Sequence, residues 1–246
     1  MATSVLTPAA LEETHTAAHY LQWVRNLIAR VKLEPDGQER IRLRIDLAKE
    51  LMNEAFPIGL LAARYFEESE QVSISLKIGS QNFDAAIVDG RSESSLVQYI
   101  EVTMADGGED DYLRMRFLHE RGEASGLGQV TKAGTKKTGL TINVAREMVS
   151  QTDVLRQERD RVRQAIERKI GKSYPPNTLL LLAFDDTMAS DRRDNIANIE
   201  AVLSDYLPGL RAFHSVAIVG LQQGLFVYRR AAGPSRSAIA RARRVI

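Results

Sequence analysis

The segment of residues 72–104 constrains the fold more than any other part of the sequence. Residues 72–79 (VSISLKIG) alternate strictly between apolar and polar side chains, which is typical of a strand with one buried face. A Gly-Ser-Gln-Asn turn follows, and residues 82–90 (NFDAAIVDG) and 96–104 (LVQYIEVTM) contain two further strand patterns. The sequence therefore predicts three consecutive antiparallel strands.

The connections between these strands determine their pairing. The first turn places Lys77 opposite Asp84, and the loop after the second strand places Asp84 opposite Glu101. In this register the apolar side chains of all three strands share one face, whereas a shift of one residue would send one apolar set to the other face. The opposite face then carries Lys77, Asp84 and Glu101 in a row, with Thr103 next to Glu101.

Two carboxylates that face each other on neighbouring strands repel each other. At a separation of about 5 Å the repulsion costs roughly 1 kcal/mol in water and about 3 kcal/mol at intermediate dielectric. A divalent cation, the Lys77 ammonium or a raised pKa could each offset this cost. A second interpretation needs no function: the row is the solvated face of a sheet on which Lys77 screens both acids.

The order of the predicted elements resembles the PD-(D/E)XK superfamily of restriction-endonuclease-like nucleases over about residues 38–184. The residues that match its motif are Asp84 in NFDAAIV and Glu101 in YIEVT. The resemblance implies that these carboxylates hold Mg²⁺ at the scissile phosphate of DNA, and that a lysine two residues after the glutamate assists the attacking water. The sequence departs from the motif twice: Phe83 stands where proline is usual, and Thr103 stands where the lysine is expected.

Other positions are candidates to complete such a site. Lys77 is the candidate for the missing lysine, because the predicted register puts it beside Asp84. The resemblance also implies a further carboxylate from the helix before the meander, which we predict over residues 38–56 and expect to end at Pro57. Glu50 and Glu54 are the candidates, because they continue a line of core residues on that helix. An amphipathic helix with a solvated end explains the same pattern.

Two basic segments are candidate contacts to nucleic acid. One is the loop predicted over residues 123–140, and the other is the C-terminal stretch of residues 229–246, which carries six arginines and no acid. Basic segments bind phosphates through counterion release, although a solvated loop and a solubilising end explain them equally well. The candidate residues are Lys132, Lys136, Lys137, Arg241, Arg243 and Arg244.

The remaining pattern completes an α/β fold. A continuous apolar run over residues 177–187 predicts a strand that is buried on both faces. The other predicted elements are a helix over 143–170, a helix over 191–206, and strands over 214–221 and 225–230. We therefore expect a mixed sheet built on the antiparallel meander and flanked by helices, with a restriction-endonuclease-like core. We expect one domain over residues 1–230, with N-terminal helices over about 1–70 and a flexible basic tail over 231–246.

Composition limits the class of protein. Hydrophobic residues make up 44% of the chain and charged residues 26%, as in an ordinary globular protein. The chain has no cysteine, which excludes disulfides and thiolate metal sites. No apolar run reaches the roughly 18–20 residues that a membrane span needs. We expect a cytoplasmic protein with no membrane partner, and a DNA partner and a homodimer are both compatible with this class.

Three functions fit the sequence. The first is a Mg²⁺-dependent DNA endonuclease that uses Asp84, Glu101 and Lys77, with Glu50 or Glu54 as a further metal ligand. The second is a protein with the same fold but no catalytic activity, which binds nucleic acid or another protein. The third is a structural α/β protein unrelated to nucleases. Thr103 at the lysine position prevents the sequence alone from separating the first two.

Overall fold

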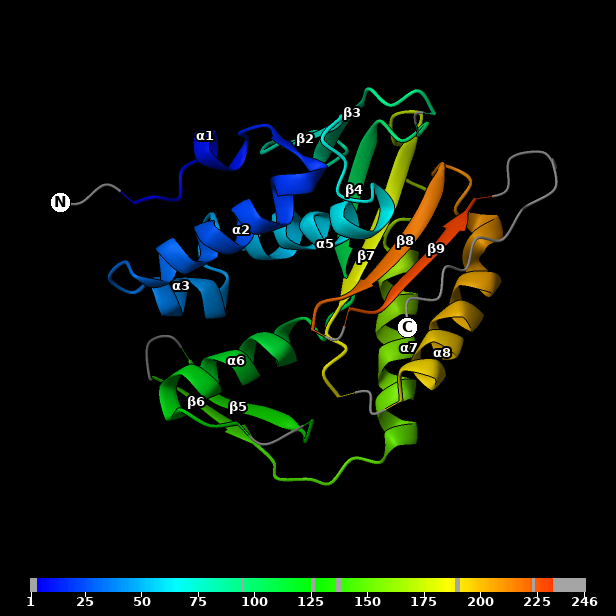
Figure 1. The fold of residues 1–246 in the computed structure, drawn as a ribbon. Helices are drawn as coiled ribbons and strands as arrows, with labels where there is room; N and C mark the ends of the chain where they lie inside the picture. The colour runs from blue at the N-terminus through cyan, green and yellow to red at the C-terminus, as the bar shows by residue number, and fades with distance from the viewer. Residues whose placement is uncertain are drawn as a thin grey trace.

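The computed structural model describes residues 4–93, 95–124, 127–135, 139–188, 191–222 and 224–231. A mixed seven-stranded sheet with the order β1-β2-β3-β4-β7-β8-β9 forms its centre, and helices cover both faces (Figure 1). Its strands are β1 (His15–Thr16), β2 (Val72–Leu76), β3 (Ala85–Asp89), β4 (Tyr99–Met104), β7 (Thr178–Phe184), β8 (Ser215–Gly220) and β9 (Phe226–Arg230). Strands β4, β7 and β8 are parallel, and the other neighbouring pairs are antiparallel. The predicted α/β class with a mixed sheet is confirmed.

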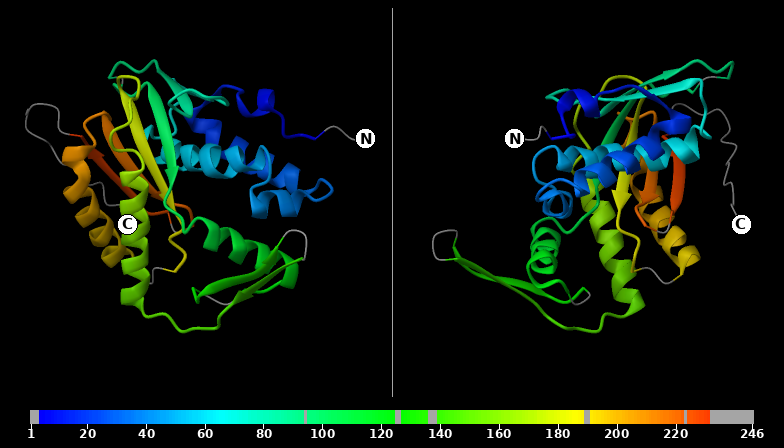
Figure 2. Two further views of the ribbon diagram at one scale, coloured as in Figure 1. Left: turned by 180° about the vertical axis from the view of Figure 1, so that it is seen from behind. Right: turned by 60° about the vertical axis from the view of Figure 1, so that its left-hand side comes forward.

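Helices from the two halves of the chain cover opposite faces of the sheet. The helical elements are α1 (Pro8–Leu11), α2 (Ala17–Lys32), α3 (Gly37–Leu43), α4 (Ala48–Glu50), the π-helical segment η1 (Leu51–Ala55), α5 (Phe56–Tyr65), α6 (Glu109–Arg121), α7 (Gln151–Glu167), α8 (Arg192–Tyr206) and the 3₁₀ turn η2 (Leu207–Gly209). Helices α2 and α5 lie on one face, and α7 and α8 lie on the other (Figures 1 and 2). Residues of α2 and α5 share one hydrophobic core with the sheet, and residues of α7 and α8 share a second.

Strand β7 contributes to both cores, as its apolar run predicts. Leu179 and Leu181 belong to the core under α2 and α5, whereas Leu180 and Leu182 belong to the core under α7 and α8. Every residue of the strand is buried. Burial on both faces explains why this segment shows a continuous apolar run instead of alternation.

The meander has the predicted register. Leu76 pairs with Ala85, and Ala85 pairs with Ile100, so the apolar residues of β2, β3 and β4 face the same core. The Lys77 N–H donates a hydrogen bond to the Asp84 carbonyl oxygen (2.8 Å), which continues the pairing by one residue. Lys77 therefore stands opposite Asp84 on the neighbouring strand, as expected.

The helix before the meander differs from the prediction. It is interrupted at residues 44–47, where Arg44 and Asp46 adopt positive φ angles of 54° and 49°. A second helical stretch then runs from Ala48 to Tyr65 and passes through Pro57 without ending. The π-helical segment directly before Pro57 explains this, because its hydrogen bonds reach one residue further: the Phe56 N–H donates to the Leu51 carbonyl.

The region between β4 and α7 also differs from the prediction. The segment expected to be a loop forms an antiparallel hairpin of β5 (Val130–Thr135) and β6 (Gly139–Val144), and α7 begins at residue 151 instead of 143. Ser150 caps α7 by accepting a hydrogen bond from the Asp153 N–H. Together with α6, the hairpin extends below the sheet (Figures 1 and 2).

The structure also bears on membrane association. No helix in the described part of the chain is long and apolar enough to span a membrane.

Candidate functional site

Asp84 lies at the point where β3 and β4 separate. Its own N–H donates to the Ile100 carbonyl (2.8 Å), which closes the last backbone hydrogen bond near this end of the pair. The Val102 N–H then donates to Oδ2 of Asp84 (2.6 Å). A side-chain carboxylate thus takes the position that a backbone carbonyl would occupy in a continuing ladder, and it is held between the two strands.

Glu101 is the second carboxylate of the site, and its partner is Lys169. The Lys169 Nζ lies 2.6 Å from Glu101 Oε1, and the two side chains are only 14% and 12% exposed. Lys169 follows the C-terminal end of α7, so it reaches the site from outside the meander. A short, largely buried ion pair of this kind offsets the repulsion between Glu101 and Asp84.

Lys77 does not have the role that the sequence suggests. Its backbone is paired with Asp84, but its ammonium makes no ion pair with Asp84 or Glu101 within the described part of the structure. Thr103, at the motif's lysine position, is buried with an exposure of 7%. The lysine that pairs with a carboxylate of this site is therefore Lys169. It contacts Glu101, which lies 68 residues earlier in the chain.

A signal in the sequence could have identified Lys169. On α7 and the turn after it, Val162, Ala165 and Ile166 form a buried stripe, and residue 169 continues this stripe at helical spacing. A lysine in line with core residues either extends its ammonium to solvent or meets a buried carboxylate. The same spacing predicts Glu50 and Glu54 on the helix before the meander.

The π-helical segment η1 supplies a third carboxylate. Burial, and then the nearby Asp84 and Glu50, raise the pKa of Glu54 to about 8. Burial and the neighbouring Glu101 raise the pKa of Asp84 to about 6, although the Val102 N–H and Lys169 act in the opposite direction. Asp84, Glu50 and Glu101 are thus close enough to Glu54 to disfavour its charged form. π-Helical turns occur frequently at functional sites.

Two oxygens beside Glu54 are buried without a hydrogen-bond partner. They are Oε2 of Glu50 and Oδ1 of Asn53, and neither contacts a donor among the described residues. Buried oxygens of this kind are normally satisfied by protein or by ordered water. Glu54 thus lies close enough to Asp84 for the two carboxylates to interact, and Glu50 lies close to Glu54.

The arrangement does not by itself form a metal centre. Within the described ranges, no group of three or more His, Cys, Asp or Glu side chains is placed so that it could hold a metal ion. The donor chemistry nevertheless suits a hard divalent cation, because carboxylate and amide oxygens are the ligands that Mg²⁺ takes in proteins. The Mg²⁺ site remains a prediction.

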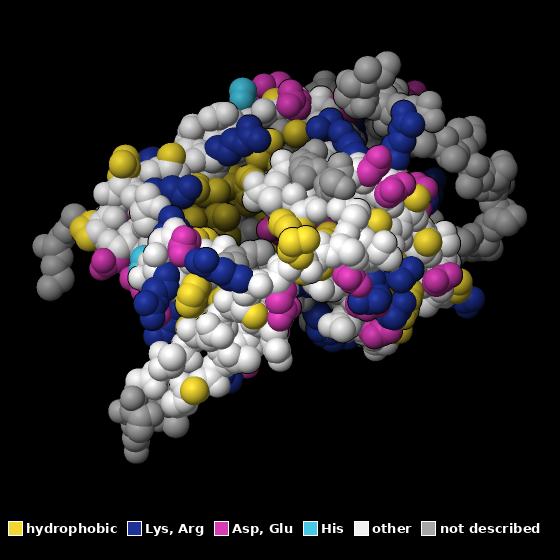
Figure 3. Space-filling model, turned by 90° about the horizontal axis from the view of Figure 1, so that it is seen from below, with side chains coloured by type: hydrophobic (Ala, Val, Ile, Leu, Met, Phe, Trp, Pro, Cys, Tyr) yellow, Lys and Arg dark blue, Asp and Glu magenta, His cyan; other side chains and the backbone are white. Residues whose placement is uncertain are grey.

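The candidate basic contacts are mostly outside the described residues. Lys136, Lys137, Arg241, Arg243 and Arg244 all lie there. Lys132 is on β5, not on a loop, and its ammonium pairs with Glu109 of α6. On the face seen from below, other Lys and Arg side chains surround a hollow with a hydrophobic floor (Figure 3).

The basic tail gives a direct test of nucleic-acid contact. Deleting residues 236–246 removes Arg236, Arg241, Arg243 and Arg244. If these arginines neutralise phosphates, we expect the deletion to weaken DNA binding and to flatten its dependence on salt concentration, because fewer counterions are released. Fluorescence anisotropy at several salt concentrations measures both quantities. An unchanged slope would show that the tail does not touch the phosphates.

Comparison with known proteins returns no match to a family model, to a curated protein or to a solved structure.

Proposed function

We propose that this protein hydrolyses phosphodiester bonds of nucleic acid with the help of a divalent cation, as a restriction-endonuclease-like nuclease of the PD-(D/E)XK type. The observation that carries the proposal is the contact between Lys169 and Glu101 beside Asp84. The resemblance implies two carboxylates and one lysine at such a site. In this chain Lys169 fulfils the requirement that Thr103 leaves open.

The side chains have separable roles in this proposal. Asp84 and Glu101 would hold the cation, with Glu54 or Glu50 as a further ligand. A bound Mg²⁺ supplies Lewis acidity toward a phosphoryl oxygen and lowers the pKa of water. Lys169 orients Glu101 and places a positive charge where negative charge accumulates during attack on a phosphodiester. The Val102 N–H keeps the Asp84 carboxylate in place.

A second function has one observation in its favour. Lys169 already compensates the charge of Glu101, so the ion pair is stable without a cation. A protein of this fold that binds nucleic acid without cleaving it would contain the same pair. Binding of a cation distinguishes the two functions.

Thermal unfolding in millimolar Mg²⁺ or Mn²⁺ tests the proposal. We expect the cation to raise the Tm by mass action, because it binds the folded carboxylates and relieves their repulsion. Asp84→Asn should abolish this increment, while it raises the Tm of the cation-free protein slightly by removing one of the repelling charges. Asp110→Asn, at an exposed carboxylate on α6, is the matched control and should keep the increment.

Cleavage is measured separately on single-stranded and duplex DNA. We expect activity that requires the cation and is lost in Asp84→Asn. A Tm increment without cleavage would favour the binding function. The absence of any increment up to about 10 mM, ten times the weakest Kd of about 1 mM that protein Ca²⁺ sites show, would contradict the proposal.

A further inference from the structure

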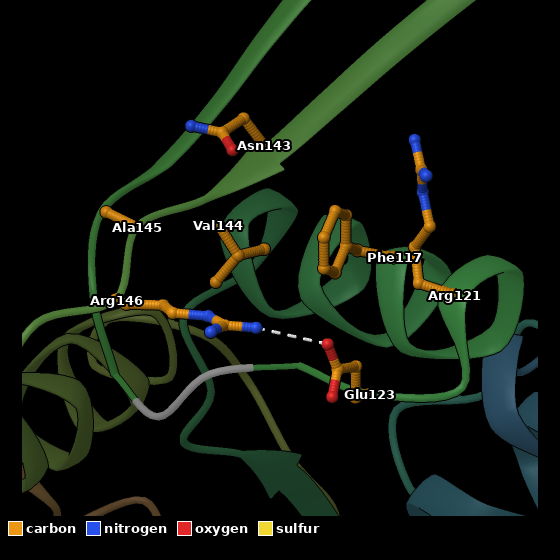
Figure 4. A pocket seen from close by; sticks show the side chains of 7 residues that line it. All are labelled: Phe117, Arg121, Glu123, Asn143, Val144, Ala145 and Arg146. Atoms are coloured by element: carbon orange, nitrogen blue, oxygen red, sulfur yellow. Dashed lines mark hydrogen bonds and ion pairs between the residues drawn. The ribbon is translucent and has the colours of Figure 1, made fainter.

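A cavity of about 390 Å³ lies away from the acidic site, between α6 and β6 (Figure 4). Small-molecule sites range from about 300 to 1,000 Å³, so the cavity has room for one nucleotide. Both elements belong to the segment between β4, which carries Glu101, and α7, which leads to Lys169. The cavity is therefore formed by the part of the chain that links Glu101 to Lys169.

One wall of the cavity is apolar and aromatic. The Phe117 ring of α6 stands between Val144 of β6 and Arg121, one turn further along α6 (Figure 4). Val144 is buried, whereas Phe117 keeps part of its ring exposed. The Arg121 guanidinium lies 6.0 Å from the centroid of the Phe117 ring. The guanidinium lies over the ring, so the two form an aromatic–arginine pair, and unstacked bases commonly bind on surfaces of this kind.

The polar side chains of the cavity favour an anion. Arg146 pairs with Glu123 at 3.1 Å, and both side chains are more than three-quarters exposed, so the pair is weak and readily exchanged. Arg121 has no carboxylate partner among the described residues. The cavity is thus lined by two guanidinium groups and one carboxylate, so the net charge of its lining is positive. Asn143, at the edge of the cavity, offers an amide that can both donate to and accept from a base edge.

We propose that this cavity binds one unpaired nucleotide of a nucleic-acid strand, with the base against Phe117 and the phosphate at Arg121. The inference rests on the proposed function, because it specifies the substrate of that site as single-stranded or locally unpaired nucleic acid. In a duplex the faces of the bases are stacked on one another, so only an unpaired base can lie against the ring. When the strand binds, Arg146 leaves Glu123 and pairs with the phosphate of an adjacent nucleotide.

Binding of a labelled oligothymidylate of about 12 nucleotides to the full chain tests this inference. EDTA in the buffer prevents cleavage, and anisotropy is recorded over a range of salt concentrations. We expect Phe117→Leu to weaken binding about 5- to 100-fold, because it keeps an apolar side chain but removes the stacking face. Arg121→Gln should weaken binding and lower the salt slope by about one, because one phosphate contact is lost.

Arg116→Gln is the matched control, since Arg116 lies on the same helix and pairs with Glu120. It should bind like the parent protein, and the parent should bind the single strand more tightly than a duplex of the same length. Circular dichroism establishes that each variant is folded. If Phe117→Leu disturbs α6, the salt slope of Arg121→Gln still decides the question.

Several outcomes would overturn the inference. These are parent-like binding by Phe117→Leu and Arg121→Gln, tighter binding of the duplex, or binding of an acidic peptide with no binding of the oligonucleotide. The Tm increment with Mg²⁺ does not involve this cavity, so the two proposals fail separately. If Mg²⁺ does not raise the Tm but the oligonucleotide still binds, the nuclease proposal is contradicted. If Mg²⁺ raises the Tm but the oligonucleotide does not bind, only the assignment of the cavity is contradicted.

Discussion

Replacing Lys169 with methionine should lower the free energy of unfolding by about 3–5 kcal/mol. The substitution keeps the length of the side chain but leaves the Glu101 carboxylate buried, charged and next to Asp84. Removing one partner of a buried ion pair is costly because the remaining charge has lost both water and its counterion. Chemical denaturation monitored by circular dichroism measures the difference. Lys172→Met, at an exposed lysine three residues further on, should change stability by no more than about 0.5 kcal/mol.

A double substitution separates the ion pair from simple packing. Lys169→Met combined with Glu101→Gln removes both charges, so most of the lost stability should return. A double variant as unstable as Lys169→Met alone would mean that the lysine stabilises the fold by packing of its alkyl chain. Under the proposed function, Lys169→Met should also abolish cleavage while the Mg²⁺-dependent Tm increment persists, because the carboxylates remain.

Glu54→Gln should change the pH dependence of stability more than any other substitution of a single acid in the described site. The pKa of Glu54 is raised from 4.5 to about 8 in the folded protein, so between these values the folded state binds more protons than the unfolded state. Stability contributed by this proton is complete below about pH 4.5 and is lost as the pH rises through 8. One pKa unit corresponds to about 1.4 kcal/mol, and we expect a loss of about 3 kcal/mol after allowing for partial exposure.

The Glu54→Gln variant should lack this loss. Its free energy of unfolding should therefore fall less between pH 5 and pH 9 than that of the parent protein. Denaturation curves at several pH values measure it. Asp84, with its pKa raised from 3.8 to about 6, adds a smaller change of the same sign at lower pH. Glu93→Gln, at an exposed acid, is the control and should follow the parent. A parent protein with constant stability between pH 5 and 9 would contradict the buried, protonated state of Glu54.

The sequence predicted the parts of the site that depend on local periodicity. Strand alternation and the lengths of two connections were sufficient to pair Asp84 with both Lys77 and Glu101, because a one-residue shift would have exposed an apolar set. The buried stripe of α7 places Lys169 in line with core residues, but the partner of Lys169 is far away in the chain and depends on how α7 crosses the sheet. No local pattern determines that crossing.

Two other misassignments have local causes. The hairpin of β5 and β6 is rich in Gly, Thr and Lys, which favours a loop, yet Leu140, Ile142 and Val144 alternate as a strand does. The expected helix end at Pro57 failed for a different reason. Proline normally clashes with the turn before it, and here that turn has π-helical hydrogen bonds.

The π-helical turn has a consequence for related sequences. Because its hydrogen bonds enclose one more residue than an α-helical turn, removing one residue from Leu51–Ala55 would replace the π-helical turn with an α-helical one, and the Pro57 ring would clash with that turn. Everything on the N-terminal side would then rotate by about 100° relative to α5. Glu50 would lose its place beside Glu54, while the hydrophobic contacts of α5 would be kept. A homologue that is one residue shorter at this point would therefore need another residue in place of Pro57 to keep this helix continuous.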